Sequence, residues 1–102
     1  MWKKMKLSSK QRAYLRSLAV SISPVLYIGK ASLTEEIIQN ADDALRTHEL
    51  IKLGVQKNCE DDARIIAEAI AEHTNAEVVT VIGKKILLYR EGKDDQKRII
   101  LP

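Results

Sequence analysis

Phenylalanine is absent from this chain of 102 residues, which also has a single tryptophan and only three tyrosines. Its hydrophobic core must therefore be built from isoleucine, leucine, valine and alanine. Hydrophobic residues make up 45% of the chain and charged residues 30%, which is typical of a globular domain and not of a disordered segment. A chain of this length is expected to form one domain with a modest core.

Long apolar runs are also missing, because none approaches the ~18–20 residues that a membrane-spanning helix needs. The N-terminal lysines are not followed by an apolar stretch, which argues against a signal peptide. Cys59 is the only cysteine, so it has no partner for an internal disulfide. These absences predict a protein without a membrane partner and fit a cytoplasmic location, where thiols stay reduced.

Charge is distributed unevenly, although the net charge is only +3. Residues 1–30 contain seven basic and no acidic side chains, and residues 31–80 contain eleven acidic and four basic ones. Residues 81–102 contain six basic and three acidic side chains. If the first and last segments lie together in space, they form a basic patch suited to nucleic acid. The alternative, that the lysines only keep a small protein in solution, stays open on composition alone.

Residue periodicity and turn signals predict seven elements in the order α-β-α-β-α-β-β. Ser8 and Ser9 are expected to cap the first helix, and Pro24 disfavours helix at the residue before it. The later elements are expected at Val25–Ile28 (strand), Ser32 to about Thr47 (helix), Leu50–Val55 (strand), Asn58–Ile70 (helix with a polar start), and Val78–Ile82 with Ile86–Tyr89 (hairpin). Arg98–Leu101 could form a short final strand.

The expected architecture is an α/β fold with a mixed four-stranded sheet. Two successive β-α-β units predict parallel strands, and the hairpin adds an antiparallel pair. The hairpin strands are apolar on both sides, so both sheet faces need cover. We therefore expect the second and third helices on one face and the first helix on the other. Residues 1–6 are expected to form a basic N-terminal tail, with Met5 a candidate natural start, and residues 7–102 a single domain.

Side chains that could support catalysis are few. His48 and His73 are isolated and fall near predicted helix ends, where a histidine more often interacts with the last carbonyl groups. Cys59 precedes three acidic residues, which oppose formation of the thiolate. The sequence has no cysteine pair and no closely spaced histidine pair for a metal site. We therefore expect no enzymatic activity, no metal and no cofactor.

The segment Gly29-Lys30-Ala31-Ser32 joins a predicted strand to a predicted helix. Backbone N–H groups and the positive end of the helix dipole gather at such a junction, which favours a bound phosphate, and Lys30 adds a full charge. The segment is too short for a Walker A motif. Ser32 followed by Glu35 matches a capping box, so Ser32 is expected to cap the helix. An ordinary, well-capped turn without a ligand remains the alternative.

The sequence also predicts where the three tyrosines lie, and where the two arginines of the first helix lie. Tyr14 falls on the apolar stripe of that helix and is expected in the core. Tyr27 and Tyr89 lie in predicted strands, where either could stack on a base, although core packing is the expected role. Arg12 and Arg16 are four residues apart and are expected to share one exposed stripe.

Three stretches together resemble the YhbY family, the bacterial single-domain members of the CRM (chloroplast RNA splicing and ribosome maturation) group. They are Lys10–Ala19; Pro24–Lys30 with Leu33-Thr34; and Glu49–Lys52 with the hairpin from Val81-Ile82-Gly83 to Leu88-Tyr89-Arg90. The resemblance runs from about Leu7 to the C-terminus. It implies a fold similar to the C-terminal domain of translation initiation factor three. It also implies RNA binding, through association with precursors of the large ribosomal subunit.

The resemblance further implies a GxxG loop that approaches the RNA backbone, and this loop maps onto Gly29–Ser32. Ser32 stands where the second glycine belongs, and a non-glycine residue resists positive φ and brings a Cβ towards the ligand. We expect Lys30→Ala to weaken RNA binding. We expect Ser32→Gly to leave RNA binding equal or tighter while stability falls slightly, through loss of the cap.

We therefore expect a monomeric, non-enzymatic RNA-binding protein that assists ribosome assembly on large-subunit precursor rRNA. A protein-interaction module that docks on ribosomal proteins through the acidic middle segment is the alternative, and a small RNA-modifying enzyme is a more distant one. The residues expected to contact RNA are Gly29, Lys30, Ala31, Ser32, Lys10, Arg12, Arg16, Lys84, Lys85 and Arg90.

Overall fold

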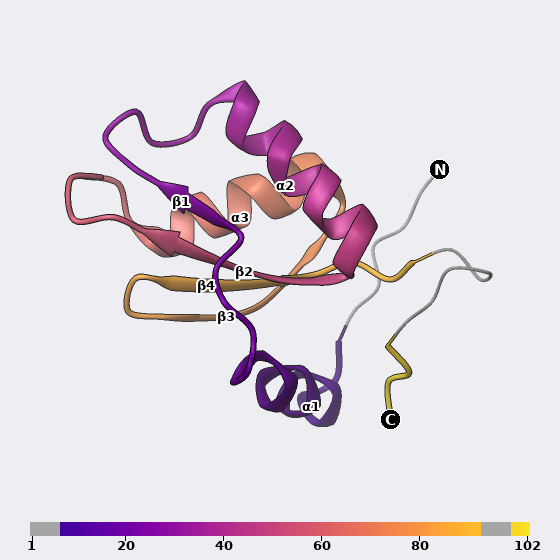
Figure 1. Cartoon of the computed structure of the whole chain (residues 1–102). Coiled ribbons are helices and arrows are strands. Elements are labelled where there is room, and N and C mark those ends of the chain that lie inside the picture. The colour runs from indigo at the N-terminus through magenta and orange to yellow at the C-terminus, as the bar shows by residue number, and fades with distance from the viewer. Residues whose placement is uncertain (1–6, 93–98) are drawn as a thin grey trace.

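The computed structural model of the chain describes residues 7–92 and 99–102, so the expected basic tail and most of the loop after residue 91 lie outside it. Within the described residues the expected order of elements is confirmed (Figure 1). The elements are α1 (Ser9–Ala19), β1 (Leu26–Ile28), α2 (Glu35–His48), β2 (Leu50–Val55), α3 (Ala63–Thr74), β3 (Glu77–Ile82) and β4 (Lys85–Tyr89).

The four strands form one mixed sheet in the order β1-β2-β4-β3, which confirms the predicted fold class. β1 pairs with β2 in parallel, whereas β4 is antiparallel to both β2 and β3. The hairpin places β4 between β2 and β3, so the second β-α-β unit joins strands that are parallel but not adjacent. No helix in this part of the chain is long and apolar enough to cross a lipid bilayer.

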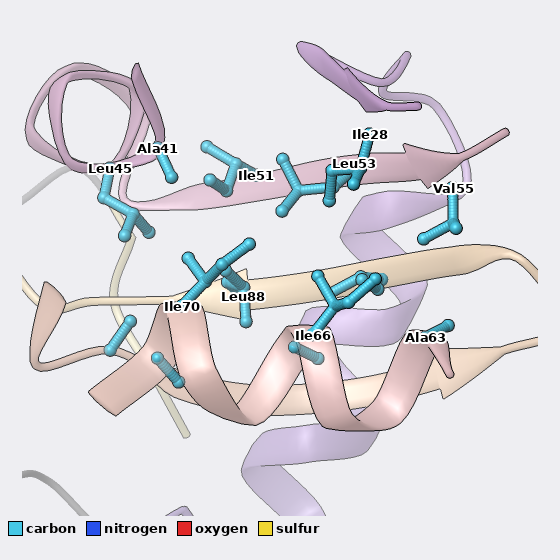
Figure 2. Close-up of a cluster of buried hydrophobic side chains, with 14 of the residues drawn as sticks. Ile28, Ala41, Leu45, Ile51, Leu53, Val55, Ala63, Ile66, Ile70 and Leu88 are labelled. Carbon is cyan, nitrogen blue, oxygen red and sulfur yellow. The ribbon is translucent and has the colours of Figure 1, made fainter. Parts of the chain in front are cut away.

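Helices cover both faces of the sheet in the expected arrangement (Figure 1). On the face covered by α2 and α3, the larger core includes Ile51 and Leu53 of β2, Ile66 and Ile70 of α3, and Leu88 of β4 (Figure 2). On the other face, α1 packs over a smaller core of Leu7, Leu15, Ala19, Leu50, Val79, Leu87 and Tyr89. Because side chains alternate along a strand, β2 and β4 each supply residues to both cores.

The helices begin where short polar side chains satisfy free backbone N–H groups. Ser8 caps α1, as the sequence predicted, and it also forms a reciprocal capping box with Gln11. α3 is capped by Asp62, which accepts a hydrogen bond from the Arg64 N–H at 2.7 Å. The predicted start of this helix at Asn58 was wrong, because residues 58–61 precede the helix and only Asp62 serves it.

The predicted cap of α2 was also wrong. Thr34 caps this helix in extended backbone conformation, and its hydroxyl accepts a hydrogen bond from the Ile37 N–H at 3.1 Å. Ser32 instead closes a turn in which its N–H donates to the Gly29 carbonyl at 2.9 Å, and its φ is +57°. A residue in this left-handed conformation cannot also adopt the extended conformation of an N-cap. Ser32 therefore adopts the backbone that a glycine would adopt more readily.

Because Thr34 and not Ser32 is the cap, Ser32→Gly is now expected to raise stability and not to lower it. This change should raise the free energy of unfolding by about 0.5–1 kcal/mol, because glycine adopts positive φ without a steric penalty. Thr34→Ala should lower it by about 1 kcal/mol through loss of the cap. Chemical denaturation of both variants measures the two effects. A lower stability in Ser32→Gly, with no loss in Thr34→Ala, would contradict the assignment of Thr34 as the cap.

Glu49 connects α2 to β2 and holds the end of the chain. Its backbone has φ +65° and ψ −47°, a sparsely populated conformation for a non-glycine residue. Its side chain is only 2% exposed, and the carboxylate accepts hydrogen bonds from the N–H of Gly92 at 2.6 Å and of Ile99 at 2.9 Å. Ile99 and Leu101 pack against the smaller core without forming a strand, so the suggested final strand is wrong where it is described; Arg98 lies outside the described residues.

Tyr89 is 1% exposed, so its expected place in the core is confirmed. Its hydroxyl oxygen is buried and makes no hydrogen bond to any other described residue. Burial, followed by the negative charges of Glu49 and Glu91, raises the pKa of Tyr89 to about 12. The unfolded chain releases this proton near pH 10, so the folded state loses relative stability as the pH rises from about 10 to 12.

Tyr89→Phe should remove this alkaline loss of stability, which is about 1.4 kcal/mol at pH 11. It should also leave stability at pH 7 unchanged or slightly higher, because it deletes a buried hydroxyl that has no partner among the described residues. Urea denaturation at pH 7 and at pH 11 measures both effects. If the native protein and Tyr89→Phe lost the same stability between pH 7 and pH 11, Tyr89 would not be the group that causes the alkaline loss.

Candidate nucleic-acid interface

Three loops lie side by side at one edge of the sheet (Figure 1). β1 and β2 are parallel and end there, and the β3–β4 turn reaches the same edge because β4 starts opposite the end of β2. The Gln56 N–H donates to the Ile28 carbonyl, and the Val55 N–H donates to the Lys84 carbonyl, each at 2.8 Å. The edge therefore gathers exposed Lys30, Lys57 and Lys84, one from each loop.

The Gly29–Ser32 turn packs against the loop after β2. A Cβ on Gly29 would lie 2.7 Å from Gln56 Oε1, so a larger residue there would displace the Gln56 side chain. Lys30 and Ala31 form the exposed tip of the turn. Glu35 and Glu36 occupy the first turn of α2 and already complement the helix dipole. The helix terminus alone is therefore a weak anion site, and Lys30 is the main cation of this turn.

Part of the sheet face on the α1 side is not covered by α1. Tyr27 of β1, Gly54 of β2 and Lys85 of β4 are register neighbours across this part of the sheet. The Tyr27 side chain is 55% exposed, so its predicted place in the core is wrong. Leu26 and Ile28 pack into or against the larger core, so alternation along the strand turns Tyr27 to the opposite face of the sheet.

Two open depressions on this face share Lys85. One is lined by Tyr27, Gly54, Val55, Gln56, Lys57, Asn58, Lys84 and Lys85. The other is lined by Arg16, Ala19, Val20, Lys52, Thr80, Ile82, Lys85 and Leu87. Five basic side chains and no acidic one line the two depressions together. We call the surface formed by Arg16, Tyr27, Lys52, Gly54, Lys57, Lys84 and Lys85 the basic sheet face.

The first helix contributes to this face unevenly, so the expected common stripe of Arg12 and Arg16 was wrong. Arg16 is exposed and lines the basic sheet face. Arg12 is half-buried and its Nη1 donates to the carbonyls of Val78 at 2.5 Å and Val79 at 3.0 Å. Arg12 therefore binds the edge strand β3. Lys10 is exposed at the other end of α1, in its first turn.

Arg90 lies at the far end of β4 from the three loops. Its Nη1 donates to Asp42 Oδ1 at 2.6 Å and to the Thr74 carbonyl at 2.7 Å, and its Nη2 donates to the Asp42 carbonyl at 3.1 Å. These bonds join the C-terminal parts of α2 and α3 to the end of β4. The structure thus brings Arg16, Lys84 and Lys85 together on one face and Lys30 to its edge, and it keeps Arg12 and Arg90 in internal contacts.

The sequence interpretation missed Lys52, Lys57 and Gly54 and assigned Tyr27 and Tyr14 to the core. Tyr14 is 38% exposed on α1, which corrects that prediction. Strand alternation was a usable signal, because Lys52 and Gly54 occupy positions between Ile51, Leu53 and Val55. Lys52 and Gly54 therefore lie on the sheet face opposite the larger core. Tyr27 lies on the same face, because it alternates with Leu26 and Ile28 along β1.

Cys59 and His73, which were considered as possible catalytic side chains, both make structural contacts. Cys59 is buried in the larger core. His73 Nδ1 lies 2.8 Å from the Ala69 carbonyl, one turn before it in α3, so its contact is structural but is not with the last carbonyl groups of the helix. In residues 7–92 and 99–102 there is no group of three or more His, Cys, Asp or Glu side chains placed to hold a metal ion.

The fold and this surface define a class: a small α/β protein whose partly open sheet face carries clustered cations and an exposed aromatic ring. The chain belongs to the CRS1/YhbY (CRM) domain family, whose model matches residues 7–90. This membership confirms the resemblance found in the sequence.

Similar proteins are known from several bacteria. The Bacillus subtilis protein named "Probable RNA-binding protein YqeI" is 38% identical over 94% of this chain and 99% of its own length. A Haemophilus influenzae protein named "RNA-binding protein" is 36% identical over 94% of this chain and 95% of its own. The solution structure of the Staphylococcus aureus hypothetical protein SAV1595, for which RNA binding has been suggested, matches with a TM-score of 0.79. It is 46% identical and covers 95% of this chain and 100% of its own.

Proposed function

We propose that this chain is a non-enzymatic RNA-binding protein that uses the basic sheet face and the adjacent Gly29–Ser32 turn. The observation that carries the proposal is the gathering of five basic side chains, with no acidic one, in two depressions that share Lys85. Such a surface attracts a polyanion and repels basic proteins. The names of the relatives from Bacillus subtilis and Haemophilus influenzae support RNA as the polyanion.

The contacts of this face are suited mainly to the RNA backbone. Lysine and arginine side chains neutralise phosphates without reading sequence, and proteins recognise structured RNA largely by its shape and backbone. We further propose that the protein is a cytoplasmic monomer that associates with rRNA in precursors of the large ribosomal subunit. This finer proposal is supported by the family resemblance of the sequence.

A second candidate function rests on the opposite layer. Exposed or half-buried acidic side chains, among them Asp42, Asp43, Glu68 and Glu72, lie on α2 and α3. This acidic layer could dock on a basic ribosomal protein. Asp42 and Asp43 already pair with Arg46, and Asp42 also pairs with Arg90, which reduces the charge available to a partner. RNA affinity of the isolated protein discriminates between the two functions.

The isolated protein should bind a structured rRNA fragment with strong salt dependence. If four to six phosphates are neutralised, log K should fall against log[salt] with a slope of about −3 to −5. Lys30→Ala should weaken binding by about 1 kcal/mol, because it removes one charge-assisted contact. Filter binding between 50 mM and 300 mM salt measures both (roughly the range over which such affinities change most). An affinity that does not vary with salt would contradict a basic RNA-binding face.

The proposed link to the large subunit needs a separate measurement in cells. Gradient fractions probed for the protein should contain it in large-subunit precursors more than in mature ribosomes. Equal occupancy of small-subunit particles would contradict this part of the proposal while leaving RNA binding itself intact.

A further inference from the structure

Tyr27 is the exposed aromatic residue of the basic sheet face, and its position is set by the sheet. It lies on β1, in register with Gly54 of β2, and Gly54 is in register with Lys85 of β4. The three residues thus form one row across three strands on the α1 side. Tyr27 is 55% exposed on a face where Arg16, Lys52 and Lys84 are close to Lys85, so about half of its surface stays free in the folded protein.

The ring leans over Gly54 because this glycine has no side chain. A Cβ on Gly54 would lie 2.9 Å from Tyr27 Cδ1 and 3.0 Å from Tyr27 Cε1, closer than carbon atoms can pack. The same point lies 3.6 Å from Lys85 Nζ. The aromatic ring and the ammonium group therefore converge above one glycine, and any side chain at position 54 would separate them.

We propose that Tyr27, Gly54 and Lys85 form a stacking site for one unpaired base of the bound RNA. The exposed ring of Tyr27 provides the surface on which the base stacks, and the ammonium groups of Lys85 and Lys84 bind the phosphates beside it. This inference rests on the proposed function and deepens it. It specifies that the bound RNA contains an unpaired nucleotide within or beside its structured part, since a base in an uninterrupted helix cannot reach the ring.

The charge around the ring favours a nucleotide over a protein side chain as the occupant. The depression that contains Tyr27 is lined by three lysines and by no acidic residue, which suits a flat ring attached to an anion. Every base has an aromatic face, so the site should discriminate little between bases. It should discriminate strongly between an unpaired and a paired nucleotide.

The test compares two RNA hairpins that differ only in one bulged nucleotide, which carries 2-aminopurine. In both hairpins a non-nucleotide linker closes the stem, so the bulge is the only unpaired base. The protein should bind the bulged hairpin about tenfold more tightly than the uninterrupted one. Tyr27→Ala and Tyr27→Leu should bind both hairpins with the affinity that the native protein has for the uninterrupted hairpin. Tyr27→Phe should retain the preference and the quenching of 2-aminopurine fluorescence, because stacking needs the ring and not the hydroxyl.

The outcomes separate this inference from the proposed function. Salt-dependent binding of both hairpins with equal affinity would overturn the stacking site and leave RNA binding in place. An equal loss for both hairpins in Tyr27→Ala and Tyr27→Leu, with unchanged melting temperatures, would also overturn it, because the ring would then serve the backbone contact alone. Failure of the native protein to bind either hairpin would overturn the proposed function together with the stacking site.

Discussion

Glu49→Ala is expected to lower the free energy of unfolding by about 3 kcal/mol, because its carboxylate accepts two backbone N–H groups in a buried site. Alanine would leave the N–H groups of Gly92 and Ile99 without this acceptor and would release the chain end from the smaller core. For a domain of this size, the melting temperature should fall by more than about 10 °C. Chemical denaturation and thermal melting measure the two quantities.

Glu68→Ala is the matched control for this substitution. Glu68 is an exposed acid on α3, so its loss should change stability by no more than about 0.5 kcal/mol. Glu49→Gln should fall between the two, since an amide offers one acceptor oxygen where the carboxylate offers two. If Glu49→Ala and Glu68→Ala had the same stability, the C-terminal segment would not be held in the way described.

Lys84→Ala combined with Lys85→Ala is expected to weaken RNA binding by at least about tenfold at moderate salt, because each lysine contributes a phosphate contact worth about 1 kcal/mol. The salt slope should become shallower by about 1.4 to 1.8, the value for two lost contacts. Both lysines are exposed, so the folded state should keep its melting temperature within a few degrees. Filter binding across a salt series provides affinity and slope together.

A second double variant with the same net charge as Lys84→Ala with Lys85→Ala shows whether RNA affinity depends on the position of the lost charges or only on their number. Arg46 and Arg64 are exposed on α2 and α3, in the helix layer, and Arg46 makes exposed ion pairs with Asp42 and Asp43. Arg46→Ala with Arg64→Ala should therefore weaken RNA binding by less than about threefold. Equal losses in the two double variants would mean that RNA responds only to overall charge, and the basic sheet face would not be its site.

Features encoded within one turn or one strand could be predicted from the sequence. Ala63, Ile66, Ala67 and Ile70 recur at helical spacing, and all four are buried on α3. Ile51, Leu53 and Val55 alternate along β2 and face the larger core. The order of elements and the two-sided cover of the sheet follow from such local patterns, because each apolar stripe must be buried against a neighbour.

Features that depend on distant partners could not be predicted. Arg12 and Arg90 bind acceptors 66 and 48 residues away in sequence, so nothing near them indicates that their charges are occupied. The choice between Ser32 and Thr34 as the cap of α2 depends on the turn that closes at Gly29. Tyr27 is exposed because α1 covers only part of its sheet face, and the placement of a helix over a sheet is a property of the whole fold.

Titration of the 15N-labelled protein with a bulged rRNA hairpin, followed by NMR, tests the central claim most directly, since it locates the RNA without any substitution. The amides of Tyr27, Gly54 and Lys85 should shift most, together with those of the Gly29–Ser32 turn. The exposed amides of α2 and α3 should shift little. The largest shifts on the acidic layer around Asp43 and Glu72, with an unchanged basic sheet face, would contradict the assignment of this face as the RNA-binding surface.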